Sequence, residues 1–139
     1  MLLPEGLIYY TKNKDGVITE KGQSDSNEIN IPIVVLINNG TASASEVVTG
    51  ALRDYNKATI VGEKSYGKGV VQSINKISNN EGIKLTIAEY FTPNGVVINK
   101  KGIKPDVEVK LNEDVKKIGI DNLENDNQLQ KAFEILKSN

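Results

Sequence analysis

The chain has 139 residues, with 17 basic and 18 acidic side chains and a formal net charge of −1. This length fits one domain with an ordinary hydrophobic core, and the near-neutral charge without a dense Lys/Arg block argues against nucleic acid as a partner. The sequence has no apolar run of roughly 20 residues that could span a bilayer, and Met1–Gly6 lacks the long apolar core of a signal peptide. We therefore expect membrane association only through regions absent from this sequence.

Cysteine and histidine are both absent. Without cysteine the chain has no disulfide and no thiol nucleophile, and its redox compartment stays open. Without histidine it lacks the usual base of a serine hydrolase and the commonest transition-metal ligand. Any hydrolytic serine here needs another base.

The first predicted elements are a short strand and a buried strand. Leu7–Thr11 is β-prone, residues 12–16 predict a turn, and the polar stretch Glu20–Asn30 predicts a loop. Ile31–Ile37 is nearly continuous in β-branched and aliphatic residues, which is typical of a strand buried on both faces of a parallel sheet. We expect this segment to be the central strand.

A helix is predicted after the buried strand. Its apolar residues recur at helical intervals: Val47, Val48, Ala51, Leu52 and Tyr55. Asn56 is positioned to close the helix, and Ala58–Val61 predicts a second strand, giving a βαβ unit that is expected to cross over right-handedly. Because ligands of such sheets lie at the carboxyl ends of the strands, Gly40–Ser45 and Gly62–Lys68 should meet at one edge.

The remaining elements are strands followed by a helix. Val70–Ile77 and Ile83–Phe91 predict an antiparallel pair joined by a turn. Residues 92–95 predict a second turn, 96–98 a short strand and 104–109 an extended piece. A C-terminal helix is predicted from a stripe at i, i+3, i+4 and i+7: Leu129, Ala132, Phe133 and Leu136. The fold class expected from this order is α/β.

Ser43 is the first candidate for chemistry. It lies where a buried strand leads into a helix, so its hydroxyl would be displayed beside the N–H donors of the helix start, a suitable place for a nucleophile. The run Ser43-Ala44-Ser45-Glu46 is also a capping box, in which Ser43 caps the helix and Glu46 bonds back. On these residues alone, capping is the simpler interpretation.

Lys68 is the second candidate. Gly67 and Gly69 flank it and allow close backbone approach. A lysine acts as a base only when neutral, which requires burial or nearby cations to lower its pKa, whereas most lysines in glycine-rich loops are solvated. Gly62–Lys68 also matches the phosphate-binding pattern G-x-x-x-x-G-K, but Gly69 stands where Ser or Thr would hold magnesium and a β-prone run follows. We therefore expect no nucleotide.

A long stretch of the sequence resembles the C-terminal processing (tail-specific) peptidases, which are Ser/Lys peptidases. The stretch runs from Pro32 to Gln72 and includes Thr41-Ala42-Ser43-Ala44-Ser45-Glu46 and Gly62–Gln72. Further matches lie in Tyr90–Pro93 and Gly102–Val107, so the resemblance covers most of the chain.

By position, the resemblance implies Ser43 as the nucleophile, Lys68 as the general base and Gln72 as the residue that orients the lysine. The Ala44 N–H is a reasonable oxyanion donor, since it follows the nucleophile at a helix start. Asp54 matches an acidic residue discussed for the family, but at a helix end beside basic residues we interpret it as structural.

Gln72 presents a geometric difficulty. Four residues of ideal strand separate its Cα from that of Lys68 by about 13 Å. Contact between the two side chains therefore needs local bending, for which a bulge near the glycines is a plausible source.

The resemblance also implies the reaction and its setting. It implies peptide hydrolysis with no metal and no organic cofactor, on a ClpP/crotonase-like β/α spiral core, with protein or peptide substrates cut near their C-terminal tails. It implies an exported or membrane-anchored, extracytoplasmic parent protein.

Within such a parent, residues 1–139 would be a partial peptidase catalytic domain, without the PDZ domain, the N-terminal part of the core or the second oxyanion donor. We expect the isolated chain to be weak or inactive, and an uncovered sheet edge could drive self-association. The alternative is a noncatalytic peptide-binding or scaffolding domain of the same fold.

Overall fold

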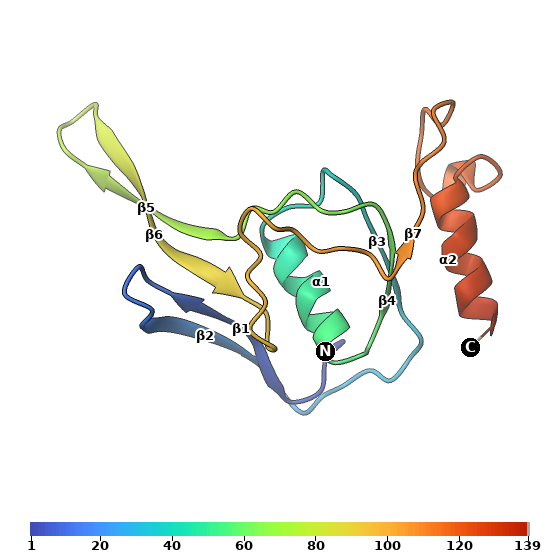
Figure 1. Ribbon diagram of the computed structural model, residues 1–139, viewed down its shortest axis with the longest axis horizontal. Coiled ribbons are helices and arrows are strands. Elements are labelled where there is room, and N and C mark those ends of the chain that lie inside the picture. Colours follow the sequence, from blue (N-terminus) through green and yellow to red (C-terminus); the bar gives the residue numbers. More distant parts are fainter. Residues whose placement is uncertain (139) are drawn as a thin grey trace.

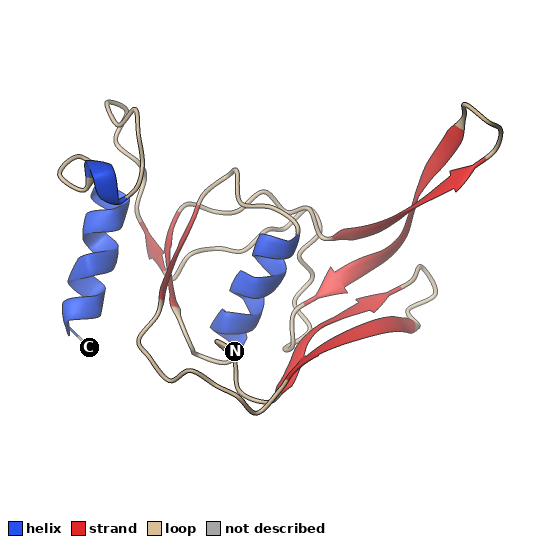
Figure 2. Ribbon diagram, turned by 180° about the vertical axis from the view of Figure 1, so that it is seen from behind, coloured by secondary structure: helices blue, strands red, loops and turns tan. Residues whose placement is uncertain are grey.

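The computed structural model describes residues 1–138, so the end of the expected domain, residue 139, lies outside the described residues. Two β-sheets and two α-helices, α1 (Ala44–Asp54) and α2 (Asn127–Ser138), form a mixed α/β arrangement. Figures 1 and 2 show α1 between the two sheets and α2 at the far side of the smaller sheet. The expected α/β class is confirmed at this level.

The larger sheet is antiparallel and has the order β2-β1-β6-β5. Its strands are β1 (Gly6–Lys12), β2 (Ile18–Ser24), β5 (Val70–Lys76) and β6 (Gly82–Phe91). The predicted strands corresponding to β1, β5 and β6 are confirmed, and Figure 1 shows the β5–β6 hairpin extending away from α1. The order leaves β5 at one edge and β2 at the other.

The predicted loop from Glu20 is wrong over its first five residues, because β2 runs through Ser24 and pairs with β1 through Thr11 and Glu20. β2 is an edge strand with mostly exposed side chains, so it tolerates the polar residues that predicted a loop.

The smaller sheet is parallel and has the order β3-β4-β7. Its strands are β3 (Val34–Ile37), β4 (Thr59–Gly62) and β7 (Val107–Glu108). The predicted parallel pair across α1 is confirmed. β3 is shorter than predicted and lies at an edge, because its pairing starts at Val34 opposite Thr59, which leaves Ile31 56% exposed. The central strand is β4.

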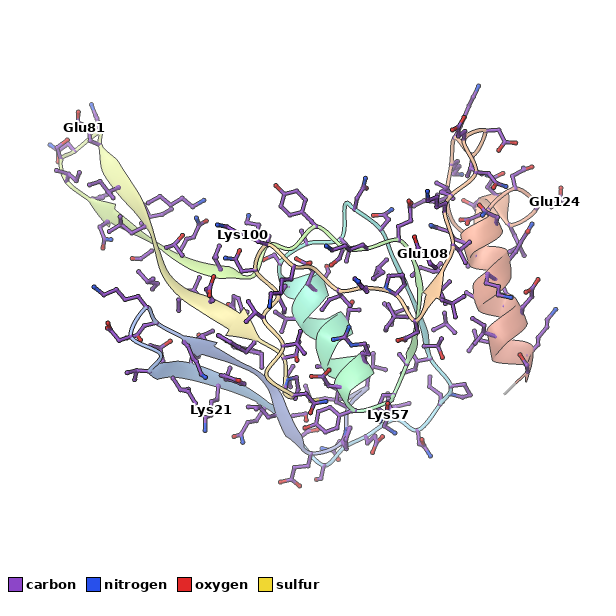
Figure 3. All side chains as sticks on the ribbon, viewed as in Figure 1. Lys21, Lys57, Glu81, Lys100, Glu108 and Glu124 are labelled. Atoms are coloured by element: carbon purple, nitrogen blue, oxygen red, sulfur yellow. The ribbon has the colours of Figure 1, made fainter. Side chains whose placement is uncertain are left out.

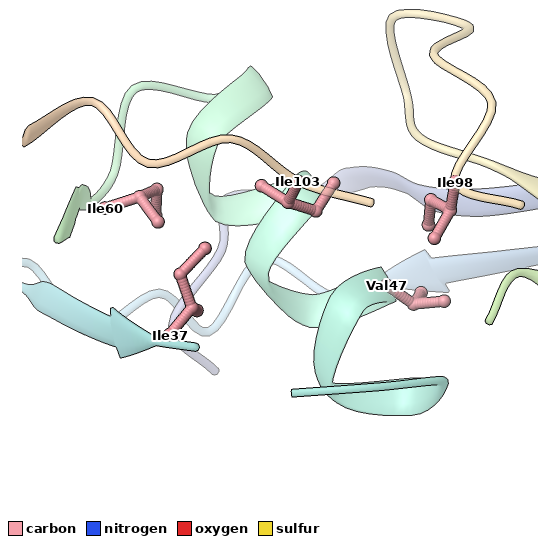
Figure 4. Packing of buried hydrophobic residues seen from close by; sticks show 5 residues of the cluster. All are labelled: Ile37, Val47, Ile60, Ile98 and Ile103. Carbon is pink, nitrogen blue, oxygen red and sulfur yellow. The ribbon is translucent and has the colours of Figure 1, made fainter. Parts of the chain in front are cut away.

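The main core lies between α1 and the segments that surround it, as Figure 4 shows. Its buried members are Ile37, Val47, Ile60, Ile98 and Ile103. Each large apolar side chain that is fully buried stabilises the fold by about 1.5–3 kcal/mol.

The predicted strand at 96–98 is reduced to a single bridge between Phe91 and Val97. The predicted turn before it is closed by a hydrogen bond from the Gly95 N–H to the Thr92 carbonyl oxygen.

Both helices have defined boundaries. Beyond the end of α1, Asn56 has a φ of 53°, the left-handed conformation expected of a closing residue. A 3₁₀ turn, η1 (Ile120–Asn122), precedes α2, which packs against β3 and β4. The side chains that α2 buries are Gln128 and Ala132, whereas Leu136 of the predicted stripe is exposed.

Charged side chains lie around the periphery, with Glu81 at the tip of the β5–β6 hairpin and Glu124 beside α2 at the opposite end (Figure 3). No helix within residues 1–138 has the length and apolar character needed to cross a membrane.

Candidate functional site

The loop that leads from β3 into α1 carries Ser43. The Thr41 N–H donates to the Asn38 carbonyl oxygen at 2.9 Å, and the Asn38 N–H donates to Thr41 Oγ1 at 3.1 Å. This compact turn brings Ser43 to the carboxyl end of β3, directly before the first residue of α1. The placement agrees with the prediction from the βαβ rule.

Ser43 has an unusual backbone conformation, with φ 59° and ψ −124°. A non-glycine residue at positive φ costs about 1–3 kcal/mol and persists only where the surrounding structure enforces it, as occurs at active sites. Glu46 bonds back to the Ser43 N–H as the capping box predicts, whereas the Glu46 N–H donates to the Ser43 carbonyl oxygen at 2.9 Å, and Ser43 is exposed at the surface. Capping and a catalytic role are therefore compatible at this residue.

Ala44 begins α1, so its N–H belongs to the first turn, whose N–H groups have no acceptor within the helix. An N–H at this place, next to Ser43, can donate to an oxyanion that forms on an attacked carbonyl.

Lys68 lies in the loop between β4 and β5. Two backbone bonds fix this loop beside the Ser43 loop: the Glu63 N–H donates to the Ile37 carbonyl oxygen, and the Tyr66 N–H donates to the Thr41 carbonyl oxygen, each at 2.9 Å. The predicted meeting of the two loops at one edge of the sheet is thus confirmed.

The Glu46 carboxylate joins the two loops. Its side chain is fully buried, and its Oε2 accepts the Ser43 N–H at 3.0 Å and the Lys68 N–H at 2.8 Å. Because both bonds end on one oxygen, the backbone nitrogens of Ser43 and Lys68 lie no more than about 6 Å apart. Glu46 was predicted only as a local capping residue, and its role across the site was missed.

The other oxygen of Glu46 completes the network. Oε1 accepts the Gly67 N–H at 2.7 Å and the Ser65 hydroxyl at 2.5 Å, and Ser65 Oγ in turn accepts the Ile103 N–H at 2.6 Å. The buried carboxylate therefore has four donors, which offset the cost of removing it from water.

The side chains of the predicted catalytic residues are less closely joined than their backbones. Ser43, Lys68 and Gln72 are all exposed, and within residues 1–138 no direct hydrogen bond connects the Ser43 hydroxyl to the Lys68 amine. Near Gln72 the β5–β6 pairing shifts register between Val71 and Gln72, and the extra residue at this shift, Ile87, lies on β6. Bending of the chain between Lys68 and Gln72 stays a prediction.

Asp54 lies at the far end of α1 from Ser43. Its Oδ2 accepts the Asn94 N–H at 2.8 Å, and its Oδ1 lies 3.7 Å from the Arg53 guanidinium. These contacts attach the end of α1 to the turn at 92–95, in agreement with the structural interpretation. Within residues 1–138, no group of three or more His, Cys, Asp or Glu side chains lies close enough together to hold a metal ion.

An open pocket of about 280 Å³ adjoins Ser43 and Ala44. Its walls are Val47 and Val48 of α1, Ile8 and Tyr9 of β1, and Tyr90 of β6. The Tyr9 hydroxyl donates to Glu20 Oε1 at 2.8 Å, and this hydrogen bond to a carboxylate raises the pKa of Tyr9 to about 12. Tyr9 is therefore neutral at physiological pH.

Residues 1–109 match the profile of Peptidase family S41. The chain belongs to peptidase family S41. Family membership therefore confirms the resemblance found in the sequence.

Two curated members of the family illustrate the extent of the match. The chain is 48% identical over 107 residues to a carboxyl-terminal-processing protease of Synechocystis sp., a match that covers 75% of this chain and 24% of that protein. It is 43% identical over 111 residues to the chloroplastic C-terminal processing peptidase of Tetradesmus obliquus, covering 78% of this chain and 24% of that one. The chain thus spans about a quarter of the length of these relatives.

A solved structure of a family member has the same fold over the matched part. The photosystem II D1 C-terminal processing protease superposes with a TM-score of 0.74 at 43% identity, over 79% of this chain and 29% of that one. The S41 match thus extends to the described fold.

Proposed function

We propose that this chain is part of the catalytic domain of a serine peptidase in which Ser43 is the nucleophile and Lys68 the general base. The observation that carries the proposal is the Glu46 carboxylate, which holds the backbones of Ser43 and Lys68 through one oxygen at the carboxyl edge of a parallel sheet. Membership of a peptidase family and the strained backbone of Ser43 support it.

In the proposed reaction, the Lys68 amine accepts the proton of Ser43 as Ser43 Oγ attacks the carbonyl carbon of a peptide bond. The Ala44 N–H donates to the oxygen that becomes negative. The protonated Lys68 then supplies a proton to the leaving amine, and water hydrolyses the acyl-enzyme. Gln72 orients the lysine when a side-chain contact forms between them.

The remaining parts of the proposal concern the larger protein. We propose that residues 1–139 form a portion of a ClpP/crotonase-like β/α spiral core, that the substrates are proteins or peptides cut near their C-terminal ends, and that the protein works outside the cytoplasm. The names of the curated relatives, carboxyl-terminal-processing protease and chloroplastic C-terminal processing peptidase, support the second of these statements.

Two substitutions test the assignment in the full-length protein with a tailed protein substrate. Ser43→Ala should abolish cleavage while lowering the free energy of unfolding by only about 0.5–2 kcal/mol, the value of a helix cap. Lys68→Arg should also abolish cleavage, because a guanidinium stays protonated and cannot accept the serine proton.

Exposed neighbours provide matched controls for both changes. Ser45→Ala and Lys64→Arg make the same chemical changes at nearby exposed positions and should retain activity. Cleavage by Ser43→Ala or Lys68→Arg at the rate of its control would contradict the assignment and favour the noncatalytic alternative.

A further inference from the structure

We propose that Lys100, Lys101 and Lys104 form a basic patch beside the proposed catalytic residues, and that this patch binds acidic side chains in the part of the substrate that follows the cleaved bond. The inference rests on the proposed function, since it assumes that Lys68 donates a proton to the leaving amine. It adds a class of substrate, proteins whose C-terminal tail carries Asp or Glu.

The segment that carries the patch pairs with the loop that carries Lys68. The Lys100 N–H donates to the Gly67 carbonyl oxygen at 2.8 Å, and the Ser65 N–H donates to the Ile103 carbonyl oxygen at 3.0 Å. Gly67 directly precedes Lys68, so Lys100 lies next to the proposed general base. Figure 3 shows Lys100 beside the start of α1.

The backbone of the patch is fixed. Lys100 has a φ of 60°, a left-handed conformation that residues other than glycine rarely adopt. Such strain persists only where the surrounding structure enforces it, as at ligand sites. The N–H groups of Lys101 and Gly102 close the turn, since both donate to the Ile98 carbonyl oxygen, at 3.1 and 2.9 Å. The three lysines therefore keep their places beside the Lys68 loop before a substrate binds.

The side chains of the patch have no acidic partner. All three lysines are exposed, and within residues 1–138 none of them makes an ion pair. Two neighbouring carboxylates already have donors: Asp106 Oδ2 accepts the Ile60 N–H at 2.8 Å, and the buried Glu46 accepts four donors. The patch therefore presents a positive potential to the solvent.

The proposed mechanism brings the released part of the substrate to this patch. The leaving amine belongs to the first residue after the cleaved bond, so the tail begins within hydrogen-bonding distance of Lys68. The adjacent lysines attract carboxylates on that tail and repel cationic side chains. One exposed ion pair contributes little, but several cations acting together raise the rate at which an acidic segment associates.

The test uses the full-length protein and three peptides with the same cleavage site. The first carries a pair of Asp residues after the cleaved bond, the second carries Asn at the same positions, and the third carries the Asp pair before the bond. At low ionic strength, kcat/KM for the first peptide should exceed that for each of the others by about 10-fold or more. Physiological salt shortens the Debye length to about 8 Å and should reduce this ratio.

The patch variant changes all three lysines of the patch to glutamine: Lys100→Gln, Lys101→Gln and Lys104→Gln. The preference for the first peptide should fall to about one, because the charges that attract its Asp residues are gone. A control variant removes the same charge at exposed positions outside the patch: Lys14→Gln, Lys21→Gln and Lys76→Gln. It should keep the preference of the unmodified protein. Thermal unfolding of both variants shows that a changed ratio comes from folded protein.

Three results would overturn the inference. Cleavage of the first peptide no faster than the other two, or a preference that the patch variant keeps, overturns it and leaves the proposed function standing. Patch-dependent binding to vesicles containing phosphatidylserine, with no preference among the peptides, overturns it and assigns the patch to a membrane surface. Absence of cleavage of every peptide and of tailed proteins by the unmodified protein overturns the proposed function and this inference together.

Discussion

At the scale of single residues, the buried Glu46 carboxylate explains how two loops from different parts of the chain hold one geometry. Its two oxygens accept the N–H groups of Ser43, Gly67 and Lys68 and the hydroxyl of Ser65. The negative charge also lies in the first turn of α1, where the helix dipole stabilises it. Stability and the arrangement of the proposed catalytic residues therefore depend on the same side chain.

Glu46→Gln tests this dependence. The amide nitrogen cannot accept a hydrogen bond, so donors that now face the carboxylate would be left without a partner, at about 1–3 kcal/mol of unfolding free energy. We expect kcat to fall more than KM rises, because Glu46 positions the reacting residues and does not touch the substrate. Urea unfolding and steady-state kinetics measure the two effects. Glu63→Gln, at a half-buried position in the same loop as Lys68, is the control. Equal stability and equal kcat in the two variants would exclude this role.

Glu46 also illustrates which contacts of a single residue the sequence could predict and which it could not. The pattern from Ser43 to Glu46 predicted the capping box, because both partners lie within one helical turn. The partners of Glu46 in the second loop lie 19 to 22 residues further along the chain, and no local pattern links them. The family resemblance indicated Ser43 and Lys68 as site residues, but it did not indicate that a carboxylate joins their backbones.

At the scale of elements, the loop after β4 keeps its path because Gly67 has a φ of 89° and lies against residues 100–102. A Cβ at this position would lie 2.9 Å from the Gly102 nitrogen, closer than a Cβ atom comes to a backbone nitrogen in folded proteins. The loop that carries Lys68 is thus fixed on one side by Glu46 and on the other by this backbone contact.

Gly67→Ala should therefore destabilise the protein by about 1–3 kcal/mol, through positive φ and the backbone clash together. Gly16→Ala is the matched control, since Gly16 also has a positive φ, 78°, but an added Cβ there would meet nothing within 4 Å. Thermal or urea unfolding compares the two. If Gly67→Ala lost no more stability than Gly16→Ala, the contact with residues 100–102 would not restrain the loop.

Strands with an apolar pattern were predicted well, and those defined by their partners were not. β1, β5 and β6 carry β-prone runs and were found close to their expected ends. β2 was missed because an exposed edge strand needs few apolar residues. β3 was assigned the central position because its run is apolar, but strand order depends on β7, whose two residues contain no signal for pairing with β4.

At the scale of the whole molecule, the described chain brings the two loops together while the Lys68 side chain stays exposed. The proposed mechanism uses a neutral amine, which burial favours. The chain spans about a quarter of the length of the two curated relatives, and the loss of one oxyanion donor costs about 10²–10³ in rate.

The 139-residue chain by itself should thus fold at least partly but cleave peptides at least about 10²-fold more slowly than a complete catalytic domain. Circular dichroism, light scattering and turnover of a tailed substrate measure folding, self-association and activity on the same sample. Turnover equal to that of the complete domain would show that residues 1–139 already contain the full chemistry.

The pairing of β6 has a consequence for local opening of the molecule. β1 bonds to β6 only between Tyr10–Lys12 and Glu89–Phe91, so within residues 1–138 the outer part of the β5–β6 hairpin is a ribbon of two strands. Such a ribbon is marginally stable in water, whereas segments held by a third strand open mainly with the whole fold. Native-state hydrogen exchange should therefore label Ile83–Leu85 well before Tyr90. Equal protection along β6 would mean that the hairpin opens only with the rest of the domain.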